Sequence, residues 1–534
     1  MSSYQMPASA YQVPRSTGST ASYWPTSSPG LSYPSPYAIR GGKTYTAASP
    51  FSKASPDTSF SPPLEEILES RPYSEYTAEF VGTFLLVYTA GVVSIVGDPT
   101  WNATAVGLLL MVLVYAFRPV SGGHLNPAVS IALGLLRKCS WRKVLIYVIV
   151  QIFAGILAGV SVSAAFGEGI LFGPVPPFGG AGALALEFIY TAMLCFVFLS
   201  CTTSSRNNPA EDQNNFFGLA IGFVLVAGGY AAGSVSGASF NPALSIGLAC
   251  TSFSESIRWA FSYTLVEVFG GMLACALFYL CHPEDFAVHT REFAPGSLSL
   301  RLLSEFLGTF VVVLTVGLNL VTRSGATAWS TAAALTSMTY SLAGVSGAHF
   351  NPAVTLAVVL CGRQKCRAMV GLAYGTVQLA AGVLAGFIYQ HYQVTGKYAD
   401  YVFGLAPAEI TLGGGSVLAA EFVFTFGLVY AVLACATTTL PASPSSSNFY
   451  FGLAIGFSLA AGSLASGAVS GGILNPAVAS GVSVGSHVAW RGTDFAPPPW
   501  TYCLWYTLVE LLAGFFAALS FHWTHVAEYT GKSY

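Results

Sequence analysis

Apolar residues are concentrated in runs of about 20 from residue 76 onward, and polar residues gather between the runs. A helix of about 20 apolar residues crosses the hydrocarbon core of a bilayer. We therefore predict an all-α membrane protein with twelve spanning helices. They lie at 76–97, 103–119, 142–166, 183–204, 215–234, 257–281, 300–322, 327–344, 367–390, 416–438, 448–467 and 499–523.

Four shorter apolar stretches lie between these runs, and each begins at an Asn-Pro-Ala tripeptide. At about 10 residues they are too short to span a bilayer, so we expect re-entrant half-helices that end inside the membrane. Asn is a favoured N-cap residue, and Pro fits the first helical turn because it has no N–H to leave unpaired. The half-helices are predicted at 126–136, 241–250, 351–361 and 475–484. The tripeptides are Asn126, Pro127, Ala128; Asn241, Pro242, Ala243; Asn351, Pro352, Ala353; and Asn475, Pro476, Ala477.

A Glu-Phe-x-x-Thr segment precedes each tripeptide, so the chain contains four related quarters. The separations from the Glu to the Asn are 47, 54, 46 and 54 residues, which indicates a pair of unlike quarters used twice. Each quarter holds three spans and one half-helix, so successive quarters enter the membrane from opposite sides, as in an inverted repeat. We expect two tandem bundles, each with six transmembrane helices and two re-entrant half-helices. The four glutamates are Glu79, Glu187, Glu305 and Glu421.

The basic residues and the Ser/Pro/Tyr-rich N-terminus complete the predicted organisation. All but four of the 21 Lys and Arg residues lie in the N-terminal tail or in loops on one face, so both termini are expected in the cytoplasm. The tail is either regulatory or a solvated segment without a specific function. The predicted domains are a disordered tail (1–74), a first channel unit (75–281), a cytoplasmic linker (282–299), a second channel unit (300–523) and a short C-terminal tail (524–534).

Composition excludes several classes of function. Charged residues make up 8% of the chain, far fewer than the quarter that is typical of soluble proteins, and a net charge of −2 does not favour nucleic acid as a partner. The ten Cys residues lie mostly in apolar segments at no metal-ligand spacing, so we expect neither a metal site nor a disulfide framework. No nucleotide-binding loop or catalytic triad is visible in the sequence. We therefore expect neither an enzyme nor a cofactor.

The segments SGGHLNPAVS (121–130) and SGAHFNPAVT (346–355), together with the Glu-Phe-x-x-Thr spans, resemble the major intrinsic protein family of aquaporins and aquaglyceroporins. The resemblance covers about 75–281 and 300–523, as a tandem fusion of two units. It implies a passive channel in a lipid bilayer, in which the half-helix N-termini and Asn amides contact small neutral solutes and repel cations, a mechanism already described for aquaporins. It also implies that the four glutamates are structural and accept hydrogen bonds from the re-entrant loops.

The resemblance locates a selectivity filter, and here the chain departs from the family. An Arg normally follows the second Asn-Pro-Ala of each unit, but this chain has Leu244 and Val478 there. Both filters consist of small uncharged residues, so we expect two non-identical pores for glycerol-like or urea-like solutes and water. The predicted filters are Val106, Gly229, Ala238 and Leu244 in the first half, and Thr331, Ser463, Gly472 and Val478 in the second.

Two intramembrane carboxylates, Glu267 and Glu510, lie where family members usually have apolar or Gly-Pro residues. An ionisable residue inside a membrane is costly and often functional, so these could line the pore or join a loop network. Gln151 and Gln378 occupy the equivalent place in the third spans, which favours a structural role.

Two alternatives to a two-pore channel remain open. The chain could be a scaffolding membrane protein that conducts poorly, or it could combine one conducting half with one degenerate half. In the second case the apolar first filter makes the first half the candidate for the degenerate one. The family usually assembles four bundles, so two copies of this chain would form a homodimer with four pores. The sequence does not distinguish the plasma membrane from an internal membrane.

Overall fold

The computed structural model describes residues 73–167, 169–209, 213–286, 296–395, 403–405, 414–438, 449–490 and 496–530. Nearly all of the predicted tail (1–74), half of the linker (287–295) and the last four residues lie outside this part of the chain. Within the described residues, all regular structure is helical.

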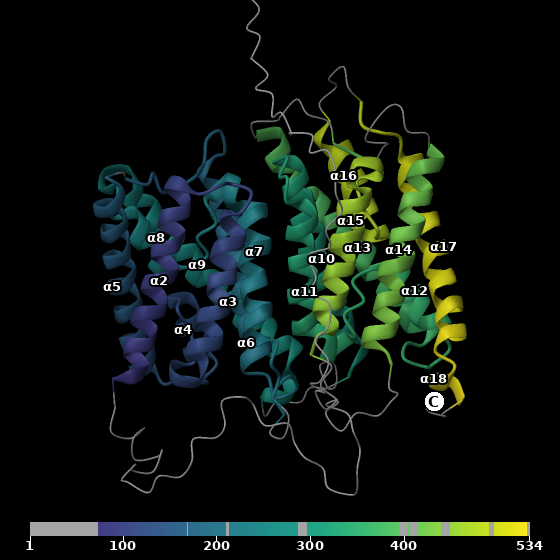
Figure 1. Ribbon diagram of the computed structural model, residues 1–534, viewed down its shortest axis with the longest axis horizontal. Helices are drawn as coiled ribbons and strands as arrows, with labels where there is room; N and C mark the ends of the chain where they lie inside the picture. The colour runs from purple at the N-terminus through teal and green to yellow at the C-terminus, as the bar shows by residue number, and fades with distance from the viewer. Residues whose placement is uncertain are drawn as a thin grey trace, which may run out of the picture. The chain divides into compact units, whose positions relative to one another are not determined.

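The first half contains six long and two short helices, in the expected order. They are α2 (Ser74–Val96), α3 (Asn102–Ser121), α4 (Pro127–Leu135), α5 (Trp141–Phe166), α6 (Gly180–Thr202), α7 (Phe217–Ser236), α8 (Pro242–Ala249) and α9 (Phe253–Cys281). The short helices α4 and α8 lie toward opposite ends of the bundle, as an inverted repeat requires (Figure 1).

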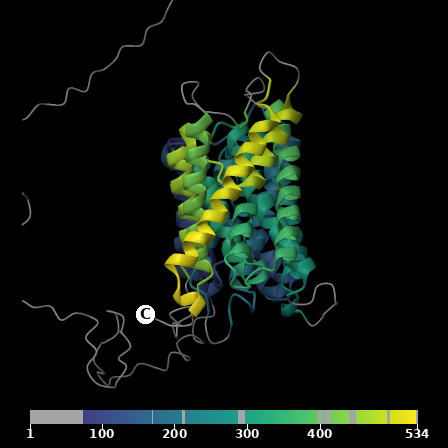
Figure 2. The ribbon, with the colours of Figure 1, turned by 90° about the vertical axis from the view of Figure 1, so that its right-hand side faces the viewer.

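The second half repeats this order after a short 3₁₀ helix, η1 (Pro283–Asp285). Its helices are α10 (Leu298–Val321), α11 (Thr327–Ser346), α12 (Pro352–Leu360), α13 (Ala368–Thr395), α14 (Gly414–Ala436), α15 (Phe451–Ser470), α16 (Pro476–Ala489), α17 (Trp500–Thr524) and α18 (Ala527–Thr530). Figure 2 shows α17, in yellow, running obliquely across this bundle. Helix α16 continues past the predicted end at 484, because no proline interrupts it and Gly485 lets it lie against the ring of Tyr389.

One predicted span, α11, differs from the other long helices. In the described residues, eleven of the twelve long helices are apolar enough to cross a membrane, and α11 is the exception. Every residue from 330 to 342 is buried, because α11 packs against α7, α10 and α15. Several of its hydroxyls bond to backbone carbonyls within the protein: Ser337 Oγ donates to Ala220 O at 2.9 Å, and Thr336 Oγ1 donates to Ala332 O at 2.8 Å. A helix surrounded by protein can therefore carry this many hydroxyls at the depth of the membrane.

Glycines allow the half-helices to lie directly against the long helices. A Cβ atom on Gly155 of α5 would be 2.2 Å from the carbonyl oxygen of Ala243, and one on Gly159 would be 2.0 Å from that of Gly247. In the second half, a Cβ atom on Gly382 of α13 would be 2.3 Å from the carbonyl oxygen of Ala477. Small residues at these crossings permit backbone contact between membrane helices, so they fix the depth at which each second half-helix begins.

The two halves meet through α6 and α7 on one side and α10 and α11 on the other. At one end of this junction, Arg206 joins three segments: its Nε donates to Glu284 Oε1 at 2.8 Å, and its Nη1 donates to Gly344 O at 2.7 Å. Burial raises the pKa of Glu284, but His282 and the positive charge of Arg206 outweigh burial and lower that pKa to about 2. Glu284 is therefore ionised at neutral pH and keeps the start of the linker against both halves.

Candidate functional site

The two Asn-Pro-Ala turns of the first half are hydrogen-bonded to each other. Asn126 Oδ1 caps α4 by accepting from Ala128 N at 2.9 Å, while its Nδ2 donates to Phe240 O at 2.9 Å. Asn241 caps α8 in the same way, and its Nδ2 donates to Leu125 O at 2.9 Å. Each Asn thus caps the N-terminus of its half-helix and also joins it to the opposite half-helix.

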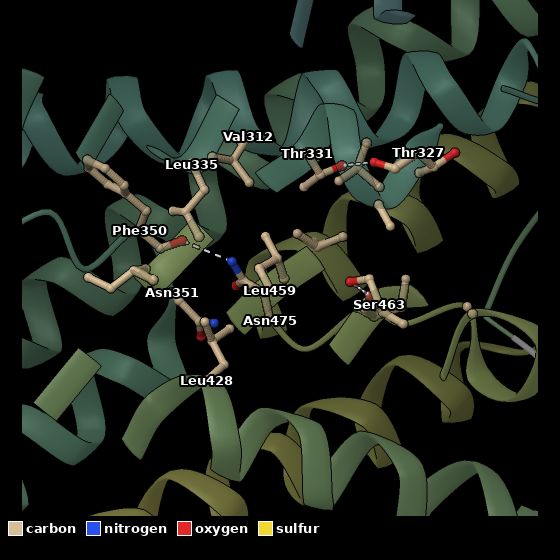
Figure 3. Close-up of a pocket in the computed structure, with 18 of the residues that line it drawn as sticks. Val312, Thr327, Thr331, Leu335, Phe350, Asn351, Leu428, Leu459, Ser463 and Asn475 are labelled. Atoms are coloured by element: carbon tan, nitrogen blue, oxygen red, sulfur yellow. Dashed lines mark hydrogen bonds between the residues drawn. The ribbon is translucent and has the colours of Figure 1, made fainter. Parts of the chain in front are cut away.

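The second half has the same arrangement, and Figure 3 shows one of its two bonds, from Asn475 to Phe350. Asn351 Nδ2 donates to Leu474 O at 2.9 Å, and Asn475 Nδ2 donates to Phe350 O at 3.0 Å. An amide nitrogen carries two hydrogens, so each Asn keeps a second N–H for a molecule in the cavity.

The residue before each Asn was not predicted to be functional, yet its carbonyl accepts the hydrogen bond from the opposite turn. All four have a left-handed backbone, with φ between 49° and 54°. This conformation is uncommon for residues other than Gly and is often found at functional sites. The sequence gives no signal for it, since the residues are large and apolar: Leu125, Phe240, Phe350 and Leu474.

The predicted structural glutamates are fully buried and accept several hydrogen bonds from the loops before the half-helices. Glu79 accepts from the backbone N–H groups of His124 (2.9 Å) and Leu125 (2.7 Å), from Ser121 Oγ (2.6 Å) and from Gln151 Nε2 (2.8 Å). Glu187, Glu305 and Glu421 accept from the matching backbone positions of their own loops. A carboxylate that accepts several hydrogen bonds holds such a loop in one conformation.

Glu267 and Glu510 belong to the same loop network. Glu267 Oε1 accepts from Asn241 N at 3.1 Å and from Ser245 Oγ at 2.8 Å, and Glu510 Oε1 accepts from Asn475 N at 2.9 Å. Neither residue is among the described residues that line the cavities. Of the two roles considered, the geometry favours the loop network over pore lining.

A cavity in the second half extends from its predicted filter to both Asn side chains. It has a volume of about 340 Å³ and is lined by Thr331, Ser463, Gly472 and Val478 as well as by Asn351 and Asn475. In Figure 3, Thr331 and Ser463 lie at one end of this cavity, while Asn351 and Asn475 lie toward the other, with Leu335 and Leu459 in the same view. Hydroxyls at one end and amides at the other give a polar molecule partners along an otherwise apolar path.

The first half has two wide cavities with a narrow cavity between them. The wide cavity at the predicted filter is called the outer cavity, and the wide cavity lined by Arg118 and Lys138 is called the inner mouth. The outer cavity, of about 570 Å³, is lined by Val106, Gly229, Ala238 and Leu244, the four predicted filter residues. The cavity at the two Asn side chains has a volume of only about 20 Å³, which is about the space that one water molecule needs. The inner mouth has a volume of about 550 Å³.

Phe198 and His124 lie between the narrow cavity and the inner mouth, because both residues line the two cavities. Leu244 lines both the narrow cavity and the outer cavity. Phe198 lies eleven residues after Glu187, and Val432 lies eleven residues after Glu421, so the two occupy equivalent positions. Val432 lines the cavity of about 340 Å³.

The apolar first filter made the first half the candidate for a degenerate half, and the cavity of about 20 Å³ is in that half. It lies at Asn126 and Asn241, however, and of the four filter residues only Leu244 lines it.

Comparisons with known proteins agree with this architecture. The family model described as "Major intrinsic protein" matches residues 66–254, 209–326 and 301–521. A probable aquaporin of the NIP type from Nicotiana alata is 32% identical over 232 residues, covering 42% of this chain and 83% of the relative. A glycerol uptake facilitator-like protein from Lactiplantibacillus plantarum is 34% identical over 219 residues, covering 40% of this chain and 99% of the relative.

Nodulin-26 from Glycine max is 33% identical over 228 residues, covering 41% of this chain and 82% of its own length. Among solved structures, the aquaglyceroporin from Plasmodium falciparum matches 40% of this chain and 98% of its own chain, with 20% identity and a TM-score of 0.35. The NIP-type aquaporin, the glycerol uptake facilitator-like protein and nodulin-26 each match less than half of this chain, while most of their own length is covered, as expected when one chain contains two units. The chain belongs to the major intrinsic protein family and contains two family units in tandem.

Proposed function

We propose that the chain is a passive channel of the aquaporin type, with two non-identical pores that lack the filter Arg. Family membership makes it an integral multi-pass membrane protein and a channel for small solutes, since its relatives are channels rather than enzymes. The observation that carries the finer proposal is the cavity of about 340 Å³ from Thr331 and Ser463 to Asn351 and Asn475. Its volume and its mixed lining suit glycerol-like or urea-like molecules as well as water.

A second candidate function is one conducting half beside one degenerate half. It is favoured by the cavity of about 20 Å³ at Asn126 and Asn241, which leaves space for about one water molecule. In that case the second half carries nearly all solute flux. A scaffolding protein that conducts through neither half is the remaining alternative. We place both termini in the cytoplasm from the distribution of Lys and Arg.

Swelling of proteoliposomes in glycerol, urea and water tests these proposals. V478R introduces a long charged side chain into the wider filter, and we expect it to remove most glycerol and urea flux. L244R makes the same change in the narrow half and serves as the matched control, with an expected loss of less than about twofold. Equal losses from both variants would show that both halves conduct equally, and no solute flux in the unmodified chain would favour the scaffold.

We also propose that two copies form a homodimer with four pores. The junction inside the chain covers α6, α7 and α10, and 78% of the residues in the most apolar part of each helix are buried. In their counterparts the share of buried residues is lower: 39% in α14, 44% in α15 and 39% in α2, which match α6, α7 and α10 in that order. In α3, the counterpart of α11, the share is 33%. Within the chain, α10 and α11 pack against α6 and α7. Helices α2 and α3 are the counterparts of α10 and α11 in the first half. A two-fold axis pairs α2 and α3 of each copy with α14 and α15 of the other, which closes the ring.

The mass of the detergent-solubilised protein is expected to be twice that of the chain, by light scattering and by native mass spectrometry in nanodiscs. V112W on the open face of α3 should shift the protein toward the monomer. The control is I149W on α5, because Val112 and Ile149 are similarly exposed, at 54% and 59%, and α5 lies outside the proposed interface. A monomeric mass for the unmodified chain in both media would contradict the proposal.

A further inference from the structure

Three side chains that can bind a metal ion gather where the linker begins. His282 directly follows α9, and Glu284 and Asp285 lie on η1. Ligand atoms from the three residues all lie within 4.8 Å of one another, and His282 Nδ1 is 3.6 Å from Glu284 Oε1. Among the described residues, no other group of three His, Cys, Asp or Glu side chains comes this close. The group contains no Cys, so the spacing of the Cys residues along the chain carried no signal for it.

Two carboxylate oxygens of this group have no hydrogen-bond partner. Arg206 Nε donates to Glu284 Oε1 at 2.8 Å, and Ser205 N donates to Asp285 Oδ1 at 3.0 Å. The second oxygen of each carboxylate, Glu284 Oε2 and Asp285 Oδ2, is buried and accepts no hydrogen bond in the described part of the chain. The Asp285 side chain is only 4% exposed. A buried carboxylate oxygen without a donor is costly, and a bound ion is one way to satisfy it.

An ion pair beside this group is closer in the second half than in the first. Arg363 contacts Glu528, and their side chains are 5% and 2% exposed. The equivalent residues of the first half are Lys138, twelve residues after the first Asn of its unit, and Asp285, eighteen residues after the Glu of the last span. Lys138 Nζ lies 3.9 Å from Asp285 Oδ1. The cation that contacts Glu528 directly in the second half is therefore farther from the carboxylate in the first half.

The second half also lacks one of the three candidate ligands. His525 follows α17 as His282 follows α9. Two residues after the His, the first half has Glu284 and the second half has Ala527. The complete group of three therefore occurs in the first half, next to the junction.

Two serines of α6 contact the two nitrogens of the His282 ring. Nε2 lies 3.3 Å from Ser200 Oγ, and Nδ1 lies 3.0 Å from Ser204 Oγ. A metal ion on Nδ1 leaves the ring hydrogen on Nε2, which then donates to Ser200, and such a second hydrogen bond usually orients a metal-binding His. The ion would replace the contact between Nδ1 and Ser204, whose Oγ also accepts from Arg206 N at 3.2 Å. The ring is thus already held in an orientation that suits metal binding.

We propose that His282, Glu284 and Asp285 form a binding site for a divalent transition-metal ion such as Zn²⁺, which ties the start of the linker to α6 and the junction. One imidazole nitrogen and two carboxylate oxygens, with water in the fourth position, are a ligand set that Zn²⁺ uses, whereas Mg²⁺ and Ca²⁺ prefer oxygen ligands alone. Arg206 and Lys138 stay near Oε1 and Oδ1, so the ion binds through Oε2 and Oδ2. The Glu284 side chain is 19% exposed, which gives the ion access from solution. The inference goes beyond the channel function and does not depend on conduction.

Zn²⁺ titration of the full-length protein in detergent tests the site. The protein is stripped with a chelator, and the number of bound Zn²⁺ ions and their affinity are measured by calorimetry in excess Mg²⁺. E284Q and D285N keep the acceptors for Arg206 and Ser205 but lose the negative charge, and S200A removes only the partner of Nε2. E75Q is the matched control, because Glu75 is a carboxylate that contacts Lys143 and is not part of the group.

We expect one Zn²⁺ per chain whose affinity falls at least about tenfold in E284Q and D285N, about tenfold in S200A, and not in E75Q. Zn²⁺ should also raise the unfolding temperature of the unmodified protein but not that of E284Q, since an ion that binds the folded state stabilises it. With Co²⁺ as the probe, the visible spectrum should show nitrogen and oxygen ligands without a thiolate charge-transfer band, which separates this site from the ten Cys residues. Equal Zn²⁺ affinity in E284Q, D285N and the unmodified chain, a thiolate band, or displacement by Mg²⁺ overturns the proposal.

Discussion

Replacing Glu421 by Leu is expected to abolish solute flux through the second pore and to destabilise the protein. Glu421 is fully buried and accepts from Ile473 N at 3.1 Å and from Leu474 N at 2.9 Å. Leu has no acceptor, so both buried N–H groups lose their partner, at a cost of about 2–5 kcal/mol. The carbonyl of Leu474 receives the amide of Asn351, so the loop that defines the pore loses its conformation together with its stability. Thermal unfolding followed by size-exclusion fluorescence and the swelling assay measure the two effects.

Two other variants separate the pore from the fold. E187L removes the equivalent acceptor of the first half, where Ser239 N and Phe240 N donate at 3.1 and 2.8 Å, and should destabilise the protein similarly. If the second pore carries the flux, E187L proteins that remain folded keep most of it. Loss of flux in both variants at equal folded yield would contradict the assignment of flux to the second half.

E510Q is the conservative control in the same network. Glu510 Oε1 accepts from Asn475 N at 2.9 Å, and a Gln side chain keeps that acceptor. The chain itself uses Gln at the equivalent place, where Gln378 Nε2 donates to Glu305 Oε2 at 2.9 Å. We therefore expect E510Q to fold and conduct nearly as the unmodified chain does, whereas E510L leaves Asn475 N unpaired and should lose stability. A large loss of flux in E510Q without loss of stability would indicate that the carboxyl group itself acts in conduction.

Repeated motifs made most of the fold predictable from the sequence. Each quarter repeats a tripeptide that caps a short helix and a Glu 46 to 54 residues before it, and both residue patterns report local structural requirements. The polarity of α11 is the opposite case: its hydroxyls fit the membrane only because α7, α10 and α15 surround it, and that burial depends on how the halves pack. The sequence contains no signal for such a junction.

The candidate site was predictable in part for the same reason. Counting from each Asn located four residues per half that do line one cavity in each case. Counting could not identify Phe198 as a side chain between the narrow cavity and the inner mouth, because its direction depends on the packing of α6. It also could not find that Thr322 to Ala326 line the outer cavity of the first half, since this segment belongs to the second half and reaches the cavity only through the junction.

Replacing Phe198 by Val is expected to open the first pore. Phe198 lines both the cavity of about 20 Å³ and the inner mouth, and the second half has Val432 at the equivalent position. In a V478R background, where the second pore is blocked, F198V should restore glycerol or urea swelling by at least about threefold. Removing part of a large side chain from a packed site usually costs about 1–3 kcal/mol, but water can occupy the widened pore, so we expect the lower end of this range.

The reciprocal change and a neighbouring Phe provide the controls. V432F should narrow the second pore and reduce its flux in the otherwise unmodified chain. F196V makes the same chemical change on α6 at a residue that is also 2% exposed but is not among the described residues lining the cavities, so it should not restore swelling. If folded F198V protein stays closed while V432F still reduces flux, Phe198 is not the barrier in the first half. The barrier would then lie at His124, which also lines the narrow cavity and the inner mouth, or at Leu225 and Leu244, which line both the outer and the narrow cavity.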